Sequence, residues 1–337
     1  MFSAPRPLPL VVAGLGLVTA LTGCSAFSDD GGGSDSGSSP RVVAAFYPLE
    51  YATQRVAGDL AEVDTLAAPG VEPHDLELTI NETALIADAS LVVYEKDFQP
   101  AIDDAVEQNA EGETLDVSGP ADLVTFESRH EHEEEEEHAD EEHTDEEHGD
   151  EEHEEDGEGH GHDHDGLDPH FWLDPLRLAD VADAIADALA DVDPDHADEY
   201  AANADTLRED LERLDAAYTE GLAECDRETV VVSHDAFGYL TRYGVHIAPI
   251  AGLSPDAEPT PADLAELHEL IEHDGITTVF SETLAAPELS ETLARDAGVD
   301  TAVLDPIEGL TDDTADEDYV SLMEQNLAAL ERANGCG

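Results

Sequence analysis

The sequence predicts an α/β protein made of two lobes of mainly parallel β-sheet joined by a long rigid α-helix. Short β-branched runs alternate with helical patterns in both halves of the chain. Strands that are apolar along most of their length are typical of parallel sheets covered on both faces. Between the two halves, a long amphipathic pattern with no strand predicts the connecting helix.

The expected strands fall into two groups, one for each lobe. Those of the first half are Arg41–Phe46, Val63–Ala67 and Ser90–Tyr94, and those of the second half are Thr229–Ser233, Val245–Ile250, Ile276–Phe280 and Val299–Leu304. Each lobe therefore has its own sheet.

Two helices are expected between the halves. The first has one apolar face, formed by Leu178, Val181, Ile185 and Leu189. The second begins at Asp193-Pro194, since an Asp cap followed by Pro is typical of a helix start. About 30 residues at 1.5 Å each give a rod of roughly 45 Å, which is long enough to act as a strut between the lobes.

The N-terminal residues are typical of an exported lipoprotein. One basic residue, Arg6, precedes an apolar run at positions 8–21. This run is shorter than the roughly 20 residues that cross a bilayer as a helix, so it is interpreted as a signal-peptide core. Leu21-Thr22-Gly23-Cys24 resembles the bacterial lipobox, which implies cleavage after residue 23 and a diacylglycerol on Cys24.

The charge of the chain limits its partners. Its 337 residues include 84 acidic and 12 basic side chains, for a net charge of −72. A polyanion repels phosphate backbones and anionic headgroups, so binding to nucleic acid and electrostatic binding to membranes are excluded. Cations are the natural partners.

Residues 130–165 form an acidic, histidine-rich loop. Because Ala139 is its only apolar residue, the loop is expected to be disordered. We interpret its nine imidazoles as a weak metal-capture segment; the alternative is a solvated loop that only maintains solubility. The histidines are His130, His132, His138, His143, His148, His153, His160, His162 and His164.

Four residues outside this loop are candidate metal ligands. His74 follows a strand and its turn, His170 lies between two Asp-Pro turns, and His234 and Asp305 directly follow expected strands. Ligands of α/β sheets bind beyond the carboxyl ends of strands, so the cleft between the lobes is the expected meeting point. Three imidazoles and one carboxylate suit Zn²⁺ better than Ca²⁺ or Mg²⁺, and bind Mn²⁺ and Fe²⁺ more weakly. Taken singly, each histidine has an equal alternative as a turn residue or a satisfied polar group.

Five segments resemble the metal-binding segments of zinc/manganese ABC-transporter substrate-binding proteins. They are residues 70–75, 168–175, 233–240, 252–259 and 304–310, and together with the histidine-rich loop they resemble the zinc-uptake branch. The resemblance implies a metal between two α/β lobes, with His74, His170 and His234 as ligands and Asp305 at the fourth position. Manganese and iron members commonly have Glu at the position of His234, which favours zinc.

The fourth ligand stays open at this point. Some zinc members have Glu directly before the first ligand histidine, where this chain has Pro73. The fourth ligand is therefore Asp305, a water molecule, or Glu72 after a rearrangement. Glu282 is a candidate to hold the other N–H of a ligand histidine, or is an ordinary exposed glutamate.

The expected organisation follows from these segments. The signal peptide covers 1–23, a flexible tether 24–40, the N-terminal lobe 41–193, the connecting helix 194–224 and the C-terminal lobe 225–337. Once Cys24 is lipidated, Cys225 and Cys336 form an even pair in an oxidising compartment, which favours a disulfide over two free thiols.

No enzyme motif is present in the sequence. The nearest approach to a His-Glu-x-x-His zinc site is His268–His273, which is one residue too long and places its two imidazoles about 140° apart around a helix. The sequence lacks a P-loop, a dinucleotide fingerprint and a nucleophile elbow.

The expected function is therefore transport. The chain would be a lipid-anchored monomer on the outer face of the cytoplasmic membrane (the periplasmic side where an outer membrane is present). There it would bind Zn²⁺ and deliver it to an ABC permease and its ATPase. The alternatives are a Mn²⁺ or Fe²⁺ member of the same family, a surface adhesin or metal buffer without a transport role, and a metallohydrolase.

Overall fold

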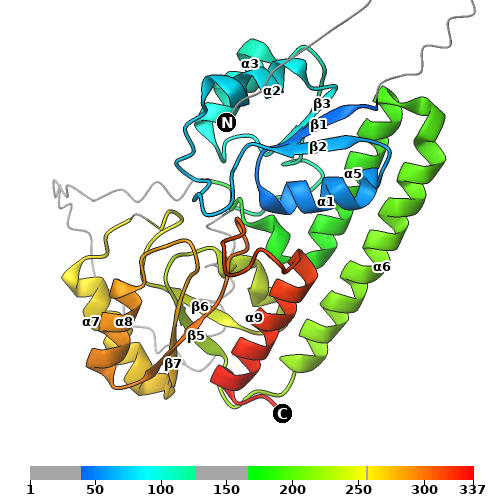
Figure 1. Ribbon diagram of the computed structural model, residues 1–337. Coiled ribbons are helices and arrows are strands. Elements are labelled where there is room, and N and C mark those ends of the chain that lie inside the picture. Colours follow the sequence, from blue (N-terminus) through cyan, green and yellow to red (C-terminus); the bar gives the residue numbers. More distant parts are fainter. Residues whose placement is uncertain (1–38, 126–165, 256) are drawn as a thin grey trace, which may run out of the picture. The chain divides into compact units, whose positions relative to one another are not determined.

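The computed structural model describes residues 39–125, 166–255 and 257–337 (Figure 1). Ser39–Gly337 form one compact unit. The predicted signal peptide, Cys24, nearly all of the tether and the nine loop histidines lie outside the described residues. Among the residues described, no helix has both the length and the apolar character that a bilayer crossing requires.

Two four-stranded parallel sheets confirm the predicted fold class. The first consists of β1 (Arg41–Ala44), β2 (Glu62–Thr65), β3 (Leu91–Tyr94) and β4 (Glu113–Asp116) in the order β2-β1-β3-β4. The second consists of β5 (Thr229–Val232), β6 (His246–Pro249), β7 (Thr278–Ser281) and β8 (Asp300–Val303) in the order β6-β5-β7-β8. In each sheet the chain first adds a strand on one side and then continues on the other side. This switch lies between the two central strands, β1 and β3 in the first sheet and β5 and β7 in the second.

The helices of the first lobe begin with recognisable signals. They are α1 (Tyr47–Ala57), α2 (Ile80–Asp88) and α3 (Pro100–Asn109). Pro48 and Pro100 lie in the first turns of α1 and α3, and Thr79 with Glu82 forms a capping box at α2. In this lobe α1 packs against β1 and β2, and α2 packs against α3 and β1.

Two long helices follow the first lobe, as predicted. They are α5 (Pro175–Val192), which is capped by the Asp174 carboxylate, and α6 (Ala197–Gly221). A 3₁₀ turn at Pro194–His196 precedes α6, so the α-helix proper begins after the Asp-Pro signal and covers 25 residues, or about 37 Å. Helix α6 packs against α5 and α1 at one end and against α9 of the second lobe at the other, which makes it a strut between the lobes.

The second lobe has helices on both faces of its sheet. They are α7 (Pro261–Asp274), α8 (Glu288–Ala297) and α9 (Tyr319–Asn334), with a 3₁₀ segment, η4, at Phe237–Tyr243. Helices α7 and α8 pack against β5, β7 and β8, and form a small core of their own with the sheet. Helix α9 contacts β5, β8 and α6.

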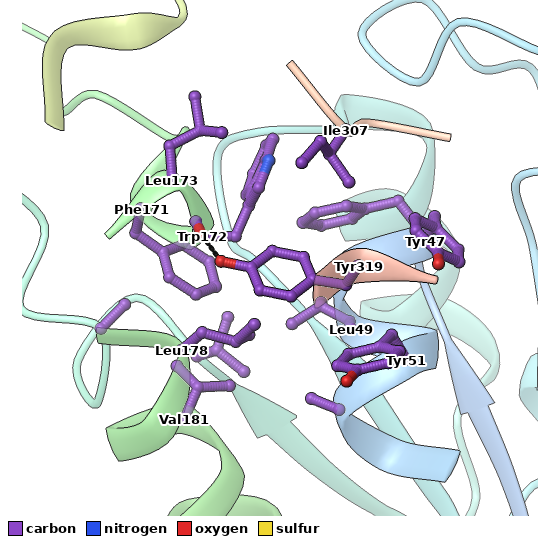
Figure 2. Close-up of a cluster of buried hydrophobic side chains, with 14 of the residues drawn as sticks. Tyr47, Leu49, Tyr51, Phe171, Trp172, Leu173, Leu178, Val181, Ile307 and Tyr319 are labelled. Carbon is purple, nitrogen blue, oxygen red and sulfur yellow. Dashed lines mark hydrogen bonds between the residues drawn. The ribbon is translucent and has the colours of Figure 1, made fainter. Parts of the chain in front are cut away.

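A cluster of buried aromatic side chains joins the two lobes (Figure 2). Trp172, in the 3₁₀ turn η2 (Phe171–Leu173), is fully buried, and its carbonyl accepts a hydrogen bond from the hydroxyl of Tyr319 on α9. Tyr319 in turn packs against Tyr51 on α1, with ring centroids 5.4 Å apart. The buried side chains of the two lobes therefore form one continuous core, which includes residues 171–173.

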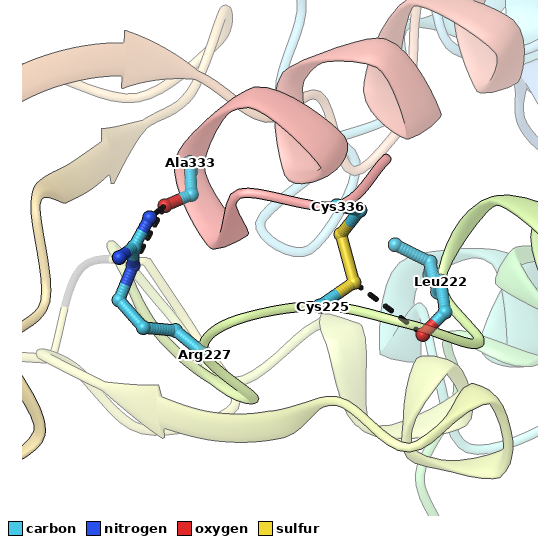
Figure 3. Close-up of a disulfide and its surroundings, with 5 residues drawn as sticks. All are labelled: Leu222, Cys225, Arg227, Ala333 and Cys336. Atoms are coloured by element: carbon cyan, nitrogen blue, oxygen red, sulfur yellow. Dashed lines mark hydrogen bonds between the residues drawn. A yellow bond between two sulfur atoms is a disulfide. The ribbon is translucent and has the colours of Figure 1, made fainter.

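A disulfide joins Cys225 to Cys336, as the cysteine count favoured (Figure 3). It links the residues after α6 to the end of α9, across a sequence separation of 111 residues. Arg227 reinforces this junction, because its Nε and Nη2 both donate to the carbonyl of Ala333. The C-terminus is thereby held against the base of the strut.

Candidate metal centre

Four side chains from distant parts of the chain converge between the lobes. His74 lies in the segment after β2, and His170 immediately precedes η2. His234 lies two residues beyond β5, and Glu308 five residues beyond β8. One nitrogen of each histidine and one oxygen of Glu308 all lie within 4.8 Å of one another. Three of the four residues, all except His170, thus lie in segments that follow the carboxyl ends of parallel strands, as this class of fold leads one to expect.

The carboxylate of Glu308 faces all three imidazoles. Its Oε1 lies 3.2 Å from His74 Nε2, 3.3 Å from His170 Nε2 and 3.5 Å from His234 Nε2. His74 Nε2 and His170 Nε2 are 3.4 Å apart. His170, His234 and Glu308 are almost completely buried, whereas the side chain of His74 is 12% exposed, so His74 is the member that solvent reaches.

Two further carboxylates fix the orientation of the buried imidazoles. His170 Nδ1 lies 2.8 Å from Asp168 Oδ1, and His234 Nδ1 lies 2.5 Å from Glu282 Oε1. Because each carboxylate accepts a hydrogen bond from Nδ1–H, the other nitrogen, Nε2, is directed into the centre of the cluster and is the one available to a metal. Glu282 was a sequence candidate for this contact; Asp168 was not, although its place two residues before His170 was the available signal.

Burial and charge act in opposite directions on this cluster. Burial disfavours the charged imidazole of His234, but the hydrogen bond to Glu282 and the negative charge of Glu308 prevail and raise its pKa to about 10. The same balance, with Asp168 and Glu308 as partners, raises the pKa of His170. Burial opposes ionisation of Glu308 too, yet its close contacts with the three histidines hold its pKa well below the usual value. Without metal, the ionised Glu308 therefore stabilises the protonated forms of the two buried imidazoles, His170 and His234.

The structure does not bring Asp305, the expected fourth ligand, into the cluster. Its Oδ1 accepts the backbone N–H of Ile307 at 2.8 Å, and Asn326 on α9 bonds to both its backbone N–H and its carbonyl. Ile307 has φ 59°, a left-handed conformation that is unusual for a β-branched residue. Asp305 therefore stabilises a tight turn, and that turn directs the side chain three residues later, Glu308, at the histidines.

Glu72 also has a role other than that of a fourth donor. Its Oε1 accepts the backbone N–H of His74 at 2.9 Å and lies 3.9 Å from His74 Nε2. The carboxylate thus holds the turn that carries His74 while staying outside the group of four donor atoms.

Two parallel α/β lobes that enclose three histidines and a carboxylate define a two-lobed metal-binding protein. The chain belongs to the family described as zinc-uptake complex component A, periplasmic, whose model matches residues 42–333. The description of this family is that of a component of a zinc-uptake system.

Individual relatives agree with this assignment. The zinc-binding lipoprotein AdcA of Streptococcus pneumoniae is 37% identical over 298 residues, which cover 86% of this chain and 55% of AdcA. The high-affinity zinc uptake system protein ZnuA of Bacillus subtilis is 33% identical over 95% of both chains. A crystal structure of Zn(II)-bound AdcA from S. pneumoniae matches with a TM-score of 0.68 and 33% identity, over 88% of this chain and 58% of that one. The chain thus spans about 55% of the length of the AdcA relatives.

Proposed function

We propose that this protein is the Zn²⁺-binding component of an ABC importer. It would capture Zn²⁺ between its lobes outside the cytoplasmic membrane and deliver it to a permease driven by a cytoplasmic ATPase. Family membership and the full-length likeness to a high-affinity zinc uptake protein support this proposal.

The spacing of the donor atoms is the observation that carries the choice of metal. Four donors placed about 2.0–2.1 Å from one ion at tetrahedral angles lie about 3.3 Å from one another. The separations in this site are 3.2, 3.3 and 3.5 Å from Glu308 to the three histidines and 3.4 Å between His74 and His170. Four of the six donor separations therefore lie near the spacing of tetrahedral zinc, the two between His234 and the other histidines are no more than 4.8 Å, and three imidazoles favour Zn²⁺ over Mn²⁺.

The chain's own residues would perform the capture. The Nε2 lone pairs of His74, His170 and His234 and one oxygen of Glu308 would replace the water shell of the ion. Asp168 and Glu282 would accept hydrogen bonds from the Nδ1–H groups of His170 and His234. These bonds stabilise the positive charge that the rings acquire on coordination. The ion is cargo, so the site must bind it tightly and still release it to a partner.

Competition of metals for the apo-protein tests this proposal. We expect titration against a zinc chelator at pH 7.5 to give one tight Zn²⁺ site per chain, and Mn²⁺ to compete only weakly. Absence of a tight site, or preference for Mn²⁺, would refute the assignment. We propose that the nine histidines of 130–165 add weak sites, which deletion of that loop should remove without loss of the tight one.

Replacing Glu282 by glutamine tests whether Glu282 holds the His234 ring in the orientation that metal binding requires. Glutamine keeps the shape of the side chain but removes the charge opposite His234 Nδ1. We expect the dissociation constant for zinc to rise about 10- to 100-fold, the range seen for partners of ligand histidines. The matched control is Glu288→Gln, an exposed glutamate on α8, which should leave zinc affinity unchanged. Equal affinities of the two variants would show that Glu282 has no part in holding His234.

The location outside the membrane is part of the same proposal. The signal peptide at 1–23, lipidation of Cys24 and the tether at 24–40 are supported by the lipobox-like sequence and by the AdcA relative, which is itself called a lipoprotein. Beyond the tether, we propose the lobes and connecting helix with the boundaries given above. Mass spectrometry of the membrane fraction should find a diacylglycerol on Cys24.

A further inference from the structure

A pocket of about 440 Å³ opens beside the metal centre, and its walls come from both lobes. Residues 95–98, which directly follow β3, line this pocket, and so do Leu253 and Ser254 of the second lobe. His74, the partly exposed member of the metal cluster, also lines this pocket. The ring of Phe98 packs edge-on against His74, with centroids 4.8 Å apart. The pocket therefore connects solvent with the exposed edge of the site.

Glu95 is the unusual residue of this pocket. It is 98% buried, because its exposed fraction is only 2%, and its Oε2 has no hydrogen-bond partner. Within the described part of the chain, no arginine, lysine or histidine forms an ion pair with its carboxylate. A buried carboxyl group without a partner is costly, and its retention calls for an explanation such as a bound ion.

The surroundings of Glu95 add negative charge rather than compensate for it. Burial raises the pKa of Glu95 well above its ordinary value, and the charges of Asp168, Asp116 and Asp103 act in the same direction. The one lysine of the chain, Lys96, is exposed at the rim. The neighbouring carboxylates attract a cation to this pocket, and a cation that reaches Glu95 would displace to solvent the proton that burial favours there.

From this arrangement we propose that Glu95 and His74 form a transit site, at which an incoming divalent cation is held before it reaches the four-donor centre. This inference rests on the proposed zinc-binding function. A carboxylate oxygen and one imidazole replace part of the water shell of the ion, and the ion then moves past His74 to the remaining three donors. Glu95 thus contributes to the rate of exchange and not to the final coordination.

Exchange kinetics of the full chain test this proposal. Trp172 is the only tryptophan, and its ring lies 5.4 Å from that of His170, so its fluorescence reports on the centre. Apo-protein is mixed with Zn²⁺ in a stopped-flow instrument, and loss of the metal is followed by a chelator chase. For Glu95→Gln we expect association and dissociation rates to fall together, by about fivefold or more, with an unchanged dissociation constant. If Glu95 lies on the path of the ion, it lowers one barrier that the ion crosses both on entry and on exit, so both rates change by the same factor.

Two further variants make the result specific. Glu95→Asp retains a carboxyl group and should recover most of the rate, whereas Asp97→Asn makes the same carboxyl-to-amide change at the exposed rim and should leave dissociation unchanged. Unaltered rates in Glu95→Gln, equal effects in Asp97→Asn, or faster dissociation with weaker affinity would each overturn the transit site. If the wild-type chain itself lacks a tight zinc site, the proposed function fails instead, so the two failures are distinguishable.

Discussion

Replacing Glu308 by glutamine is expected to weaken zinc binding by about 100-fold or more, beyond the range typical of residues that only orient a ligand. Glu308 supplies the one negative charge among the four donor atoms, and its Oε1 lies within 3.5 Å of all three Nε2 atoms. Glutamine has the same size but coordinates zinc poorly, and it removes the negative charge that the two buried imidazoles share.

Asp305 provides the matched comparison, since it is a second buried carboxylate in the same segment. In Asp305→Asn the side-chain carbonyl still accepts the N–H of Ile307, so the turn persists and zinc affinity should change less than about threefold. Asp305→Ala removes that acceptor from the turn at Ile307. Its loss of zinc affinity should lie between those of Asp305→Asn and Glu308→Gln. Calorimetric titration with a competing chelator measures all three variants. A loss in Asp305→Asn as large as that in Glu308→Gln would make Asp305 the ligand after all.

Zinc affinity is also expected to depend strongly on pH. Zinc requires neutral imidazoles, but in the metal-free site the pKa of His234 is raised to about 10 and that of His170 is raised above its ordinary 6.5. Below pH 6.5 both rings carry a proton that the metal must displace. Each displaced proton costs about tenfold in affinity per pH unit, so between pH 6.5 and 5.5 the dissociation constant should rise about 100-fold.

The sign of this effect is opposite for the metal-free fold. A raised histidine pKa stabilises the folded chain fully below pH 6.5, and that contribution is lost as the pH rises through the folded value, about 10 for His234. Acid therefore favours the empty protein and releases the metal. Calorimetry in buffers of different ionisation enthalpy should record two or more protons released per zinc at pH 6. A dissociation constant that does not vary between pH 6.5 and 5.5 would contradict histidine coordination.

Much of the fold could be predicted because its signals are local. Seven of the eight strands of the two sheets were expected from apolar, β-branched runs. The exception, β4, has the sequence Glu-Thr-Leu-Asp with an exposed first half, and it forms a strand because β3 pairs with it. Such an edge strand lacks the apolar run on which sequence reasoning depends. The α-helical part of the strut begins three residues after Pro194 because a 3₁₀ turn intervenes there.

By itself, the sequence indicated the two-lobed class from local strand and helix patterns, the cysteine pair from the cysteine count, and the three histidines from segments that resemble a known family. The tertiary structure alone decided which carboxylate faces those histidines. Asp305 and Glu308 lie three positions apart, and their directions depend on a left-handed Ile307 and on contacts from distant elements. Asn326 on α9 holds the backbone of Asp305, and the indole N–H of Trp172 donates to the carbonyl of Pro306. The unpaired burial of Glu95 likewise exists only once both lobes are folded, since burial is a property of neighbours that the linear sequence does not specify.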